Sequence, residues 1–246
     1  MPTLSPAARL YSQARRNLLP RHERLVAVAG RWQHAHLQRL GVEPEVTLRC
    51  GELPYAAAYD ISEKILARLH PGLAAPALLS VVRLPCWTPA EVLRPDARLL
   101  LVADGIEYAG NLGTLVRTAD AAGADGLVLT NATCRLTHPK VFEASRGTVL
   151  TLPTLEYASV GEARRDLAAA GFTAYVADPA AATPYLDVDY ARKVAIVVGS
   201  EGDGVAAEWR TPDLARVSIP MRGTADSLNV AASASILLFD ARARLR

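Results

Sequence analysis

The sequence predicts an α/β protein whose second half forms a parallel sheet with helices on both faces. Three observations support this fold class. From residue 99 onward, short β-branched segments alternate with amphipathic helical segments. Residues 99–103 and 194–198 are continuously apolar, which is typical of strands buried on both faces of a parallel sheet. Polar, glycine-bearing loops follow several strands, and ligands of such sheets bind beyond the carboxyl ends of the strands.

Length and composition place the chain among globular proteins. It has 246 residues, half of them apolar, which allows one large or two small domains with sizeable cores. The formal net charge is only +2, but the basic side chains are almost all arginine. Arginine suits phosphate recognition, although a GC-rich genome would give the same bias, and both explanations stay open.

The cysteine, histidine and hydropathy patterns argue against a disulfide-rich, metal-binding or membrane protein. Cys50, Cys86 and Cys134 are far apart, and they predict neither a disulfide framework nor a zinc site. His34 and His36, two residues apart, cannot share a helix face, so we expect no metal site. No apolar run approaches 18 residues and no signal peptide is recognisable, so we expect a cytoplasmic protein without a membrane partner.

A first domain is predicted over residues 1–92, as a small sheet covered by helices. The basic segment 1–22 has apolar residues at helical spacing, and is either a solvated amphipathic helix or an arm that contacts RNA. Residues 87–98 contain two prolines and mixed charge and are predicted to be a linker. The other predicted elements are strand 25–29, helix 32–40, strand 46–49, helix 61–69 with Ser62 as a possible N-cap, and strand 78–83.

The second domain is predicted over residues 97–246, and its elements alternate regularly. Strand 99–103 is followed by a polar loop and a helix over 112–122, which ends at Gly123. The remaining predicted elements are strand 127–129, helix 140–145, strand 149–152, helix 161–170, strands 173–177, 194–198 and 217–219, and a helix that opens at 227–229 and runs to the C-terminus.

The first polar loop carries an asparagine and an arginine. Asn111 occupies a predicted N-cap position. Its side chain would either accept hydrogen bonds from the N–H groups of the first helical turn or contact a ligand. Arg117 lies six residues later and is expected to project roughly along the same face. A charged side chain in this apolar helix predicts either a phosphate or carboxylate clamp or a buried salt bridge.

Two further loops supply glycines, a carboxylate and apolar side chains. The stretch 199–204 holds three glycines directly after a buried strand, more than a plain turn requires, and Glu201 offers a carboxylate to a hydroxyl or a cation. Ile219 and Leu228 would enclose a planar ring, with polar contacts from two neighbouring residues, Ser227 and Asn229. We expect all three loops to meet in one pocket.

Three motifs, NLGTLVRTADAAGAD, VVGSEGDGV and IPMRGTADSLNVAASASILLF, resemble those of the SpoU/TrmH branch of the SPOUT class, knotted S-adenosylmethionine-dependent RNA methyltransferases. The resemblance covers the whole second domain. Through RLVAVAG, YDISEKILARL and LLSVVRLP, the first domain is similar to a ribosomal-protein-like substrate-binding domain, with Ala29 where related sequences usually carry glutamate. The stretch EASRGTVLTLP resembles the thiostrepton-resistance branch, which modifies ribosomal RNA.

The resemblance implies a deep trefoil knot, an exception to the usual rule against knots. It also implies a homodimer with its sites near the shared interface. The cofactor S-adenosylmethionine would be cradled by the backbone around Gly199, Ile219 and Leu228, and no metal is implied.

The resemblance also nominates catalytic residues, with Arg117 as the central one. Because the pKa of arginine is above about 12, a clamp on the phosphate beside the ribose is a more conservative role for Arg117 than a neutral base. Asn111, Ser227 and Asn229 would orient the reacting groups, and Glu201 would hold Arg117 or the ribose.

The predicted function is therefore methyl transfer to a ribose 2′-hydroxyl, with RNA and not DNA as the partner. Ribosomal RNA is favoured over transfer RNA because of the additional N-terminal domain. The alternatives are a transfer-RNA 2′-O-methyltransferase and an inactive RNA-binding homologue. A nicotinamide-dependent dehydrogenase is disfavoured because the GxGxxG motif is missing.

Overall fold

The computed structural model describes residues 4–57 and 59–245 and divides the chain into two units. The first comprises Met1–Pro85 and Arg135–Glu143, and the second Cys86–Cys134 and Ala144–Arg246. The predicted boundary left residues 135–143 in the second domain, and the structure differs there. Within the first unit, Arg135 Nη1 donates to the carbonyl of Leu19 at 2.8 Å, and Thr137 Oγ1 donates to Asn17 Oδ1 at 3.2 Å. These contacts attach the segment to the first unit.

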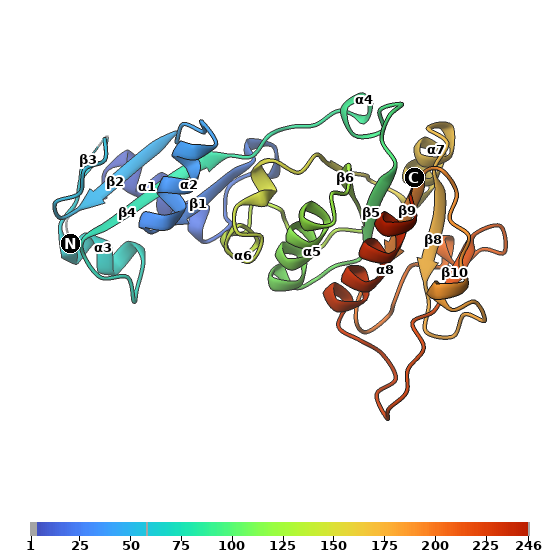
Figure 1. Cartoon of the computed structure of the whole chain (residues 1–246). Helices are drawn as coiled ribbons and strands as arrows, with labels where there is room; N and C mark the ends of the chain where they lie inside the picture. The colour runs from blue at the N-terminus through green and yellow to red at the C-terminus, as the bar shows by residue number, and fades with distance from the viewer. Residues whose placement is uncertain (1–3, 58, 246) are drawn as a thin grey trace. The chain divides into compact units, whose positions relative to one another are not determined.

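The first unit contains a four-stranded sheet in the order β1-β4-β2-β3. Strands β1 and β2 pair antiparallel with β4, and β3 pairs parallel with β2 (Figure 1). The prediction of a small sheet with helices is confirmed. Its elements are α1 Pro6–Arg15, the 3-10 helix η1 Arg21–Glu23, β1 Leu25–Ala29, α2 Arg31–Arg39, β2 Val46–Cys50, β3 Tyr59–Asp60, α3 Glu63–Leu69, β4 Ala77–Arg83 and α6 Pro139–Ala144, whose last residue lies in the second unit.

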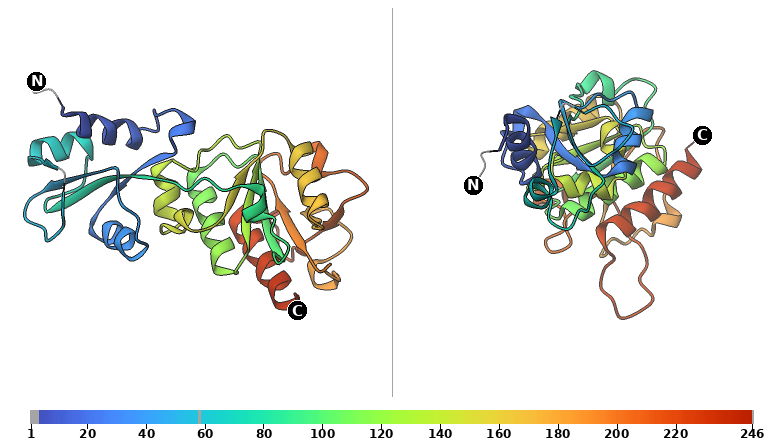
Figure 2. Two further views of the ribbon diagram at one scale, coloured as in Figure 1. Left: turned by 90° about the horizontal axis from the view of Figure 1, so that it is seen from above. Right: turned by 90° about the vertical axis from the view of Figure 1, so that its left-hand side faces the viewer.

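The basic N-terminal segment forms an amphipathic helix. In α1 the side chains of Ala7, Ala8, Tyr11 and Ala14 are buried, and the helix contacts β1, β2 and β4 (Figure 2). Ser5 caps the helix, because its Oγ accepts a hydrogen bond from the backbone N–H of Ala8 at 3.2 Å. The apolar face of α1 is therefore part of the core, while its arginines stay on the other side.

The second unit contains a six-stranded sheet in the order β10-β8-β9-β5-β6-β7, and every pairing in it is parallel. The predicted parallel sheet is confirmed. Its elements are α4 Pro89–Val92, β5 Leu99–Asp104, α5 Ala109–Ala121, β6 Gly126–Thr130, η2 Thr148–Leu150, β7 Thr154–Glu156, α7 Val160–Ala169, β8 Thr173–Ala177, η3 Tyr185–Asp187, β9 Val194–Val198, η4 Ala207–Trp209, β10 Ala215–Val217 and α8 Val230–Arg244.

Helices cover both faces of this sheet. On one face α5 and α8 lie side by side and contact β5, with α8 also contacting β9 (Figure 1). On the other face α7 and η4 pack over alternate strand residues, and Trp209 is fully buried among them. Because both faces are covered, the central strands read as continuous apolar runs, and only their ends can present polar groups.

Four predicted elements are wrong in position. Residues 149–152 do not form a strand: Arg146 and Gly147 both have positive φ, 56° and 83°, and the chain then closes into η2. Helix α5 begins at Ala109 instead of 112, and α8 begins at Val230 instead of 227. Strand β10 spans Ala215–Val217 instead of 217–219, so the loop that leads to α8 starts at Ser218 and extends away from the sheet (Figure 1).

In the two ranges that the structure describes, no helix combines the length and the apolar character needed to cross a membrane.

Candidate active site

A cavity of about 350 Å³ lies at the carboxyl ends of β8, β9 and β10. The loop after β9 forms one wall, and the loop before α8 forms another. Five of the eight predicted site residues line it: Gly199, Glu201, Ile219, Ser227 and Leu228. The strand-end rule therefore places the second and third loops correctly.

The loop after β9 folds back on itself as a tight reversal. The backbone N–H of Ser200 donates to the carbonyl of Gly204 at 3.0 Å, and the N–H of Gly204 returns a bond to Ser200 at 3.1 Å. A Cβ on Gly199 would lie 2.1 Å from the carbonyl carbon of Gly204, so no side chain fits at this position. Gly204 has φ +69°, a conformation that favours glycine. Two of the three glycines are thus required by the reversal itself.

The cavity lining is acidic and partly apolar. Four carboxylates line it and no lysine or arginine does, while Ile219 and Leu228 supply apolar surface; the carboxylates belong to Asp178, Glu201, Asp203 and Asp226. Asp178 is already paired, since Arg216 Nη1 lies 3.2 Å from its Oδ2. Such a lining suits a ligand that combines positive charge with an apolar ring.

Sequence reasoning missed Asp178 and Asp226. Asp178 follows β8 directly, so the same strand-end rule that selected Gly199 would have found it. Asp226 has no comparable signal, because it lies within the loop before α8 and its neighbours give no periodic pattern.

A second recess, of about 370 Å³, adjoins the cavity and brings in the first loop. The two share Ser200–Asp203 and Val230, and Asn111 lines only the second. The N-cap of α5 is Tyr108, and Asn111 lies inside the first turn. The capping role that the sequence left open for Asn111 is therefore wrong, and its amide faces the recess.

Asn229 links the three loops. It is the N-cap of α8, where its Oδ1 accepts from the backbone N–H of Ala231 at 3.0 Å. Its Nδ2 donates to Asn111 Oδ1 at 3.3 Å and also to Glu201 Oε1. One amide thus caps α8 and also contacts one residue in each of the other two loops. Ser227 Oγ bonds its neighbour Asp226 at 3.4 Å.

Arg117 does not follow the prediction. It lines neither cavity, its side chain is exposed, and within the described residues it makes no hydrogen bond or ion pair. Six residues along a helix correspond to about 600°, which puts Arg117 roughly 120° around the axis from Asn111. The predicted common face is therefore wrong, and Arg117 forms neither a buried salt bridge nor a clamp in the cavity of its own chain.

The described part of the chain holds no group of three or more histidine, cysteine, aspartate or glutamate side chains that is suited to a metal ion. Cys50, Cys86 and Cys134 are free thiols.

Comparison with known proteins identifies close relatives of this fold. The SpoU rRNA methylase family model matches residues 98–239. An uncharacterised tRNA/rRNA methyltransferase of Synechocystis is 34% identical over 75% of this chain and 67% of its own length. The 23S rRNA (guanosine(2553)-2′-O)-methyltransferase of Bacillus subtilis is 34% identical over 64% of this chain and 62% of its own length. The chain thus spans about two thirds of these relatives.

The similarity to a solved structure extends over both units. The SpoU methyltransferase AviRb of Streptomyces viridochromogenes, crystallised with its cofactor AdoMet, superposes with a TM-score of 0.83 and 25% identity, covering 98% of each chain. The family model matches more than half of the chain and includes both strand-end loops and most of α8. The chain belongs to the SpoU rRNA methylase family.

Proposed function

We propose that this protein transfers a methyl group from S-adenosylmethionine to a ribose 2′-hydroxyl of ribosomal RNA. The observation that carries the proposal is the acidic and apolar cavity bounded by Gly199, Ile219 and Leu228. Family membership supports the same activity, because named relatives methylate ribose 2′-oxygens in 23S rRNA.

The cavity fits the methyl donor in chemistry as well as in size. S-adenosylmethionine supplies an electrophilic methyl group on a positively charged sulfur. Ile219 and Leu228 would hold its adenine ring, and backbone groups of the Gly199 loop would form hydrogen bonds with the polar edge of that ring. The carboxylate of Glu201 suits the positive charge of the sulfonium. The cavity volume of about 350 Å³ lies in the range of roughly 300–1,000 Å³ typical of small-molecule sites.

The side chains around the cavity position the acceptor hydroxyl relative to the methyl donor. A ribose hydroxyl is a weak nucleophile, so catalysis needs alignment and help with its proton. Asn229 holds Glu201 and Asn111 in fixed positions, so that a carboxylate and an amide oxygen face the space beside the donor cavity. Ser227 adds a hydroxyl at the cavity wall.

Arg117 joins this site in a homodimer. It is exposed on α5, away from the cavity of its own protomer, and the neighbouring helix α8 exposes an apolar stripe. The stripe has the spacing of one helical face, and its members are Ala232, Ile236, Phe239 and Ala243. A second copy that covers α8 would lie next to α5 and could receive the Arg117 guanidinium beside its own cavity. There the guanidinium clamps the phosphate next to the target ribose.

The first unit binds the RNA, and the second unit carries the trefoil knot implied by the family. The first unit has 13 basic and 7 acidic side chains, whereas the second has 14 and 18. This excess of positive charge in the first unit favours a polyanion partner.

The proposed knot is supported by the path of the chain in the second unit. The chain leaves β9, pairs β10 with β8, and returns to pack α8 on α5 and β9.

Transfer of tritium from labelled S-adenosylmethionine tests the function. The substrates are ribosomal and transfer RNA from cells with and without the gene, and the labelled ribose is then mapped. We expect label in ribosomal RNA from the deletion strain only. Label in transfer RNA would show that transfer RNA, and not ribosomal RNA, is the substrate. Binding of the cofactor and of RNA without methyl transfer would identify an inactive homologue.

A further inference from the structure

Tyr108 is a largely exposed aromatic side chain at the start of α5. It is the N-cap residue of α5, yet its side chain makes no capping hydrogen bond, and 65% of its surface is exposed. Within the described residues no ring contact or hydrogen bond of its side chain is present. It stands at the edge of the recess that also holds Asn111.

The recess has a definite chemical character. Its lining includes the carboxylates of Glu107, Glu201 and Asp203, and no lysine or arginine. A phosphate placed there would be repelled by like charge. A neutral nucleoside would not be, because its hydroxyl and amino groups can donate to carboxylates and to the amide oxygen of Asn111.

The recess is also continuous with the cavity assigned to the methyl donor. The two share the loop Ser200–Asp203 and Val230, so a sugar at the junction would lie beside both. The volume of about 370 Å³ is again within the range of small-ligand sites, roughly 300–1,000 Å³. An aromatic ring at the outer edge of such a recess offers a stacking surface for a base taken out of its helix.

We propose that this recess is the acceptor subsite and that the base of the target nucleotide stacks on the ring of Tyr108. The inference rests on the proposed RNA methyl transfer and adds a residue that positions the acceptor. The flanking phosphates bind outside the recess, because its own lining is acidic. Stacking on Tyr108 tolerates any base, so Tyr108 contributes affinity, while the choice of nucleotide depends on other groups.

The test compares Tyr108→Ala with Tyr108→Phe, which keeps the ring and removes the hydroxyl. The measurements are KM and kcat with ribosomal RNA from the deletion strain, the Kd for that RNA, the Kd for S-adenosylmethionine, and the oligomeric state. We expect Tyr108→Ala to raise KM and the RNA Kd roughly tenfold or more. Tyr108→Phe should remain within about twofold of the wild type, and cofactor affinity and assembly should not change in either variant.

Leu186→Ala is the matched control, because Leu186 is similarly exposed, at 57%, and lines neither cavity. An unchanged KM in Tyr108→Ala, or a Tyr108→Phe variant as weak as Tyr108→Ala, would overturn the stacking role. So would loss of assembly or of cofactor binding together with the rise in KM, because Tyr108 would then be a structural or interface residue. A wild type that transfers no methyl group refutes the proposed function instead, and the RNA Kd of the variants still decides the subsite.

Discussion

Asp104 is a buried carboxylate at the end of β5 that ties the loop after β9 to the sheet. Its side chain is 1% exposed and accepts three hydrogen bonds. The donors are Thr130 Oγ1 and Asn131 Nδ2, both at 2.8 Å, and the backbone N–H of Ala206 at 2.7 Å. The last of these anchors the chain directly after the Gly199–Gly204 reversal. Asp104 therefore positions the cavity wall although it does not line the cavity.

We predict that Asp104→Ala lowers the free energy of unfolding by about 3 kcal/mol, because it leaves one buried donor, Thr130, and two partly buried donors without an acceptor. Affinity for S-adenosylmethionine should fall as well, since the loop end is released. Asp104→Asn keeps one acceptor oxygen and should lose less in both respects. Urea unfolding and calorimetric titration measure the two effects. Wild-type cofactor affinity in a folded Asp104→Ala protein would show that the anchor is unimportant for the loop.

At the scale of elements, the start of α8 combines a helix cap with contacts to two other loops, because Asn229 bonds Ala231, Asn111 and Glu201. Serine caps a helix about as well as asparagine does, but it has no amide donor. Asn229→Ser should therefore keep the unfolding free energy within a few tenths of a kcal/mol while reducing kcat about tenfold or more, because Glu201 and Asn111 lose their shared donor. Asn229→Ala should lose activity and also about 1 kcal/mol of stability.

A cap outside the site gives the control for this comparison. Ser159 Oγ accepts from the backbone N–H of Glu162 at 3.2 Å at the start of α7. Ser159→Ala should cost about 1 kcal/mol and leave kcat unchanged. If Asn229→Ser methylates RNA at the wild-type rate, the amide of Asn229 has a capping role only.

The elements that sequence alone predicted well are those in which one physical signal dominates. Strands Leu25–Ala29, Thr173–Ala177 and Val194–Val198 have the predicted bounds, because a β-branched apolar run ends at each side in polar or small residues. Residues 149–152 carry the same apolar signal, but the left-handed turn at Arg146 and Gly147 precedes them, and no local pattern of residues indicates that turn. The start of α5 was missed because tyrosine is not among the usual N-cap residues, whereas Asn111 is.

The site was predictable to the extent that it follows from strand ends. The loops after β9 and β10 had to open at the same edge of a parallel sheet, which brought Gly199, Ile219 and Leu228 together. The direction of Arg117 follows from helix periodicity, and the prediction of one common face with Asn111 is wrong because six residues correspond to about 600°. The role of Asn229 depends on two hydrogen bonds between residues more than 25 positions apart, which no local pattern contains.

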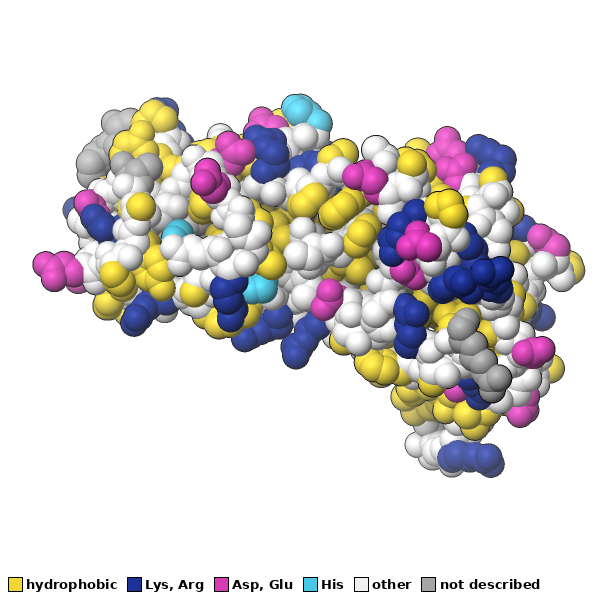
Figure 3. All heavy atoms as spheres, turned by 45° about the horizontal axis from the view of Figure 1, so that its top comes forward, with side chains coloured by type: hydrophobic (Ala, Val, Ile, Leu, Met, Phe, Trp, Pro, Cys, Tyr) yellow, Lys and Arg dark blue, Asp and Glu magenta, His cyan; other side chains and the backbone are white. Residues whose placement is uncertain are grey.

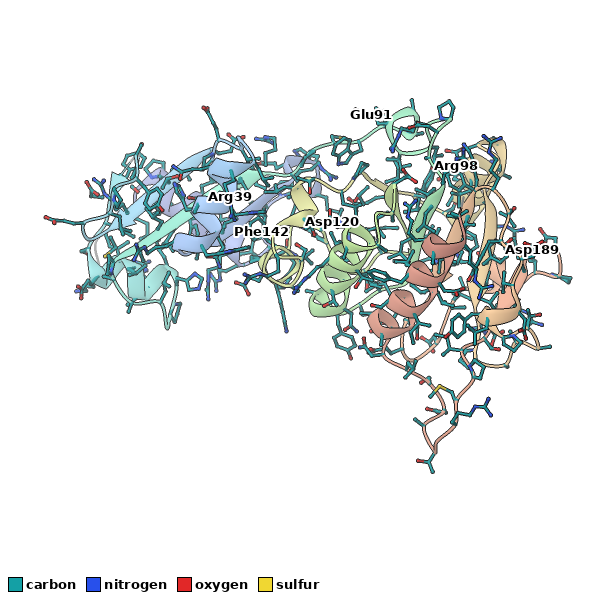
Figure 4. All side chains as sticks on the ribbon, viewed as in Figure 1. Arg39, Glu91, Arg98, Asp120, Phe142 and Asp189 are labelled. Carbon is teal, nitrogen blue, oxygen red and sulfur yellow. The ribbon has the colours of Figure 1, made fainter. Side chains whose placement is uncertain are left out.

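For the whole molecule, the uneven charge of the two units predicts a salt-dependent step in RNA binding. Arg31 and Arg39 are exposed on α2 of the basic unit, and Arg39 is labelled in Figure 4. Figure 3 shows the exposed lysine and arginine side chains on one face of the molecule. If both contact phosphates, Arg31→Ala with Arg39→Ala should reduce the slope of log Kd against log salt by about 1.5. Cofactor affinity should not change.

The corresponding control removes two exposed arginines from the acidic unit, Arg165 and Arg192. Their double alanine variant should keep the wild-type salt slope. If both double variants lower the slope equally, RNA contacts the two units alike, and the first unit has no special role in binding.

The proposed homodimer would decide how Arg117 acts, because Arg117 lines neither cavity of its own chain. We expect Arg117→Ala to abolish methyl transfer with nearly unchanged cofactor affinity, and Glu201→Ala to be inactive as well. If Arg117 serves the partner's cavity, a heterodimer of these two variants has one site with both defects and one intact site. Mixing and re-equilibrating equal amounts should then restore about a quarter of the wild-type rate, since half of the dimers are mixed. If Arg117 acts within its own protomer, every site in the mixture lacks one residue, and the rate stays at the level of the separate variants.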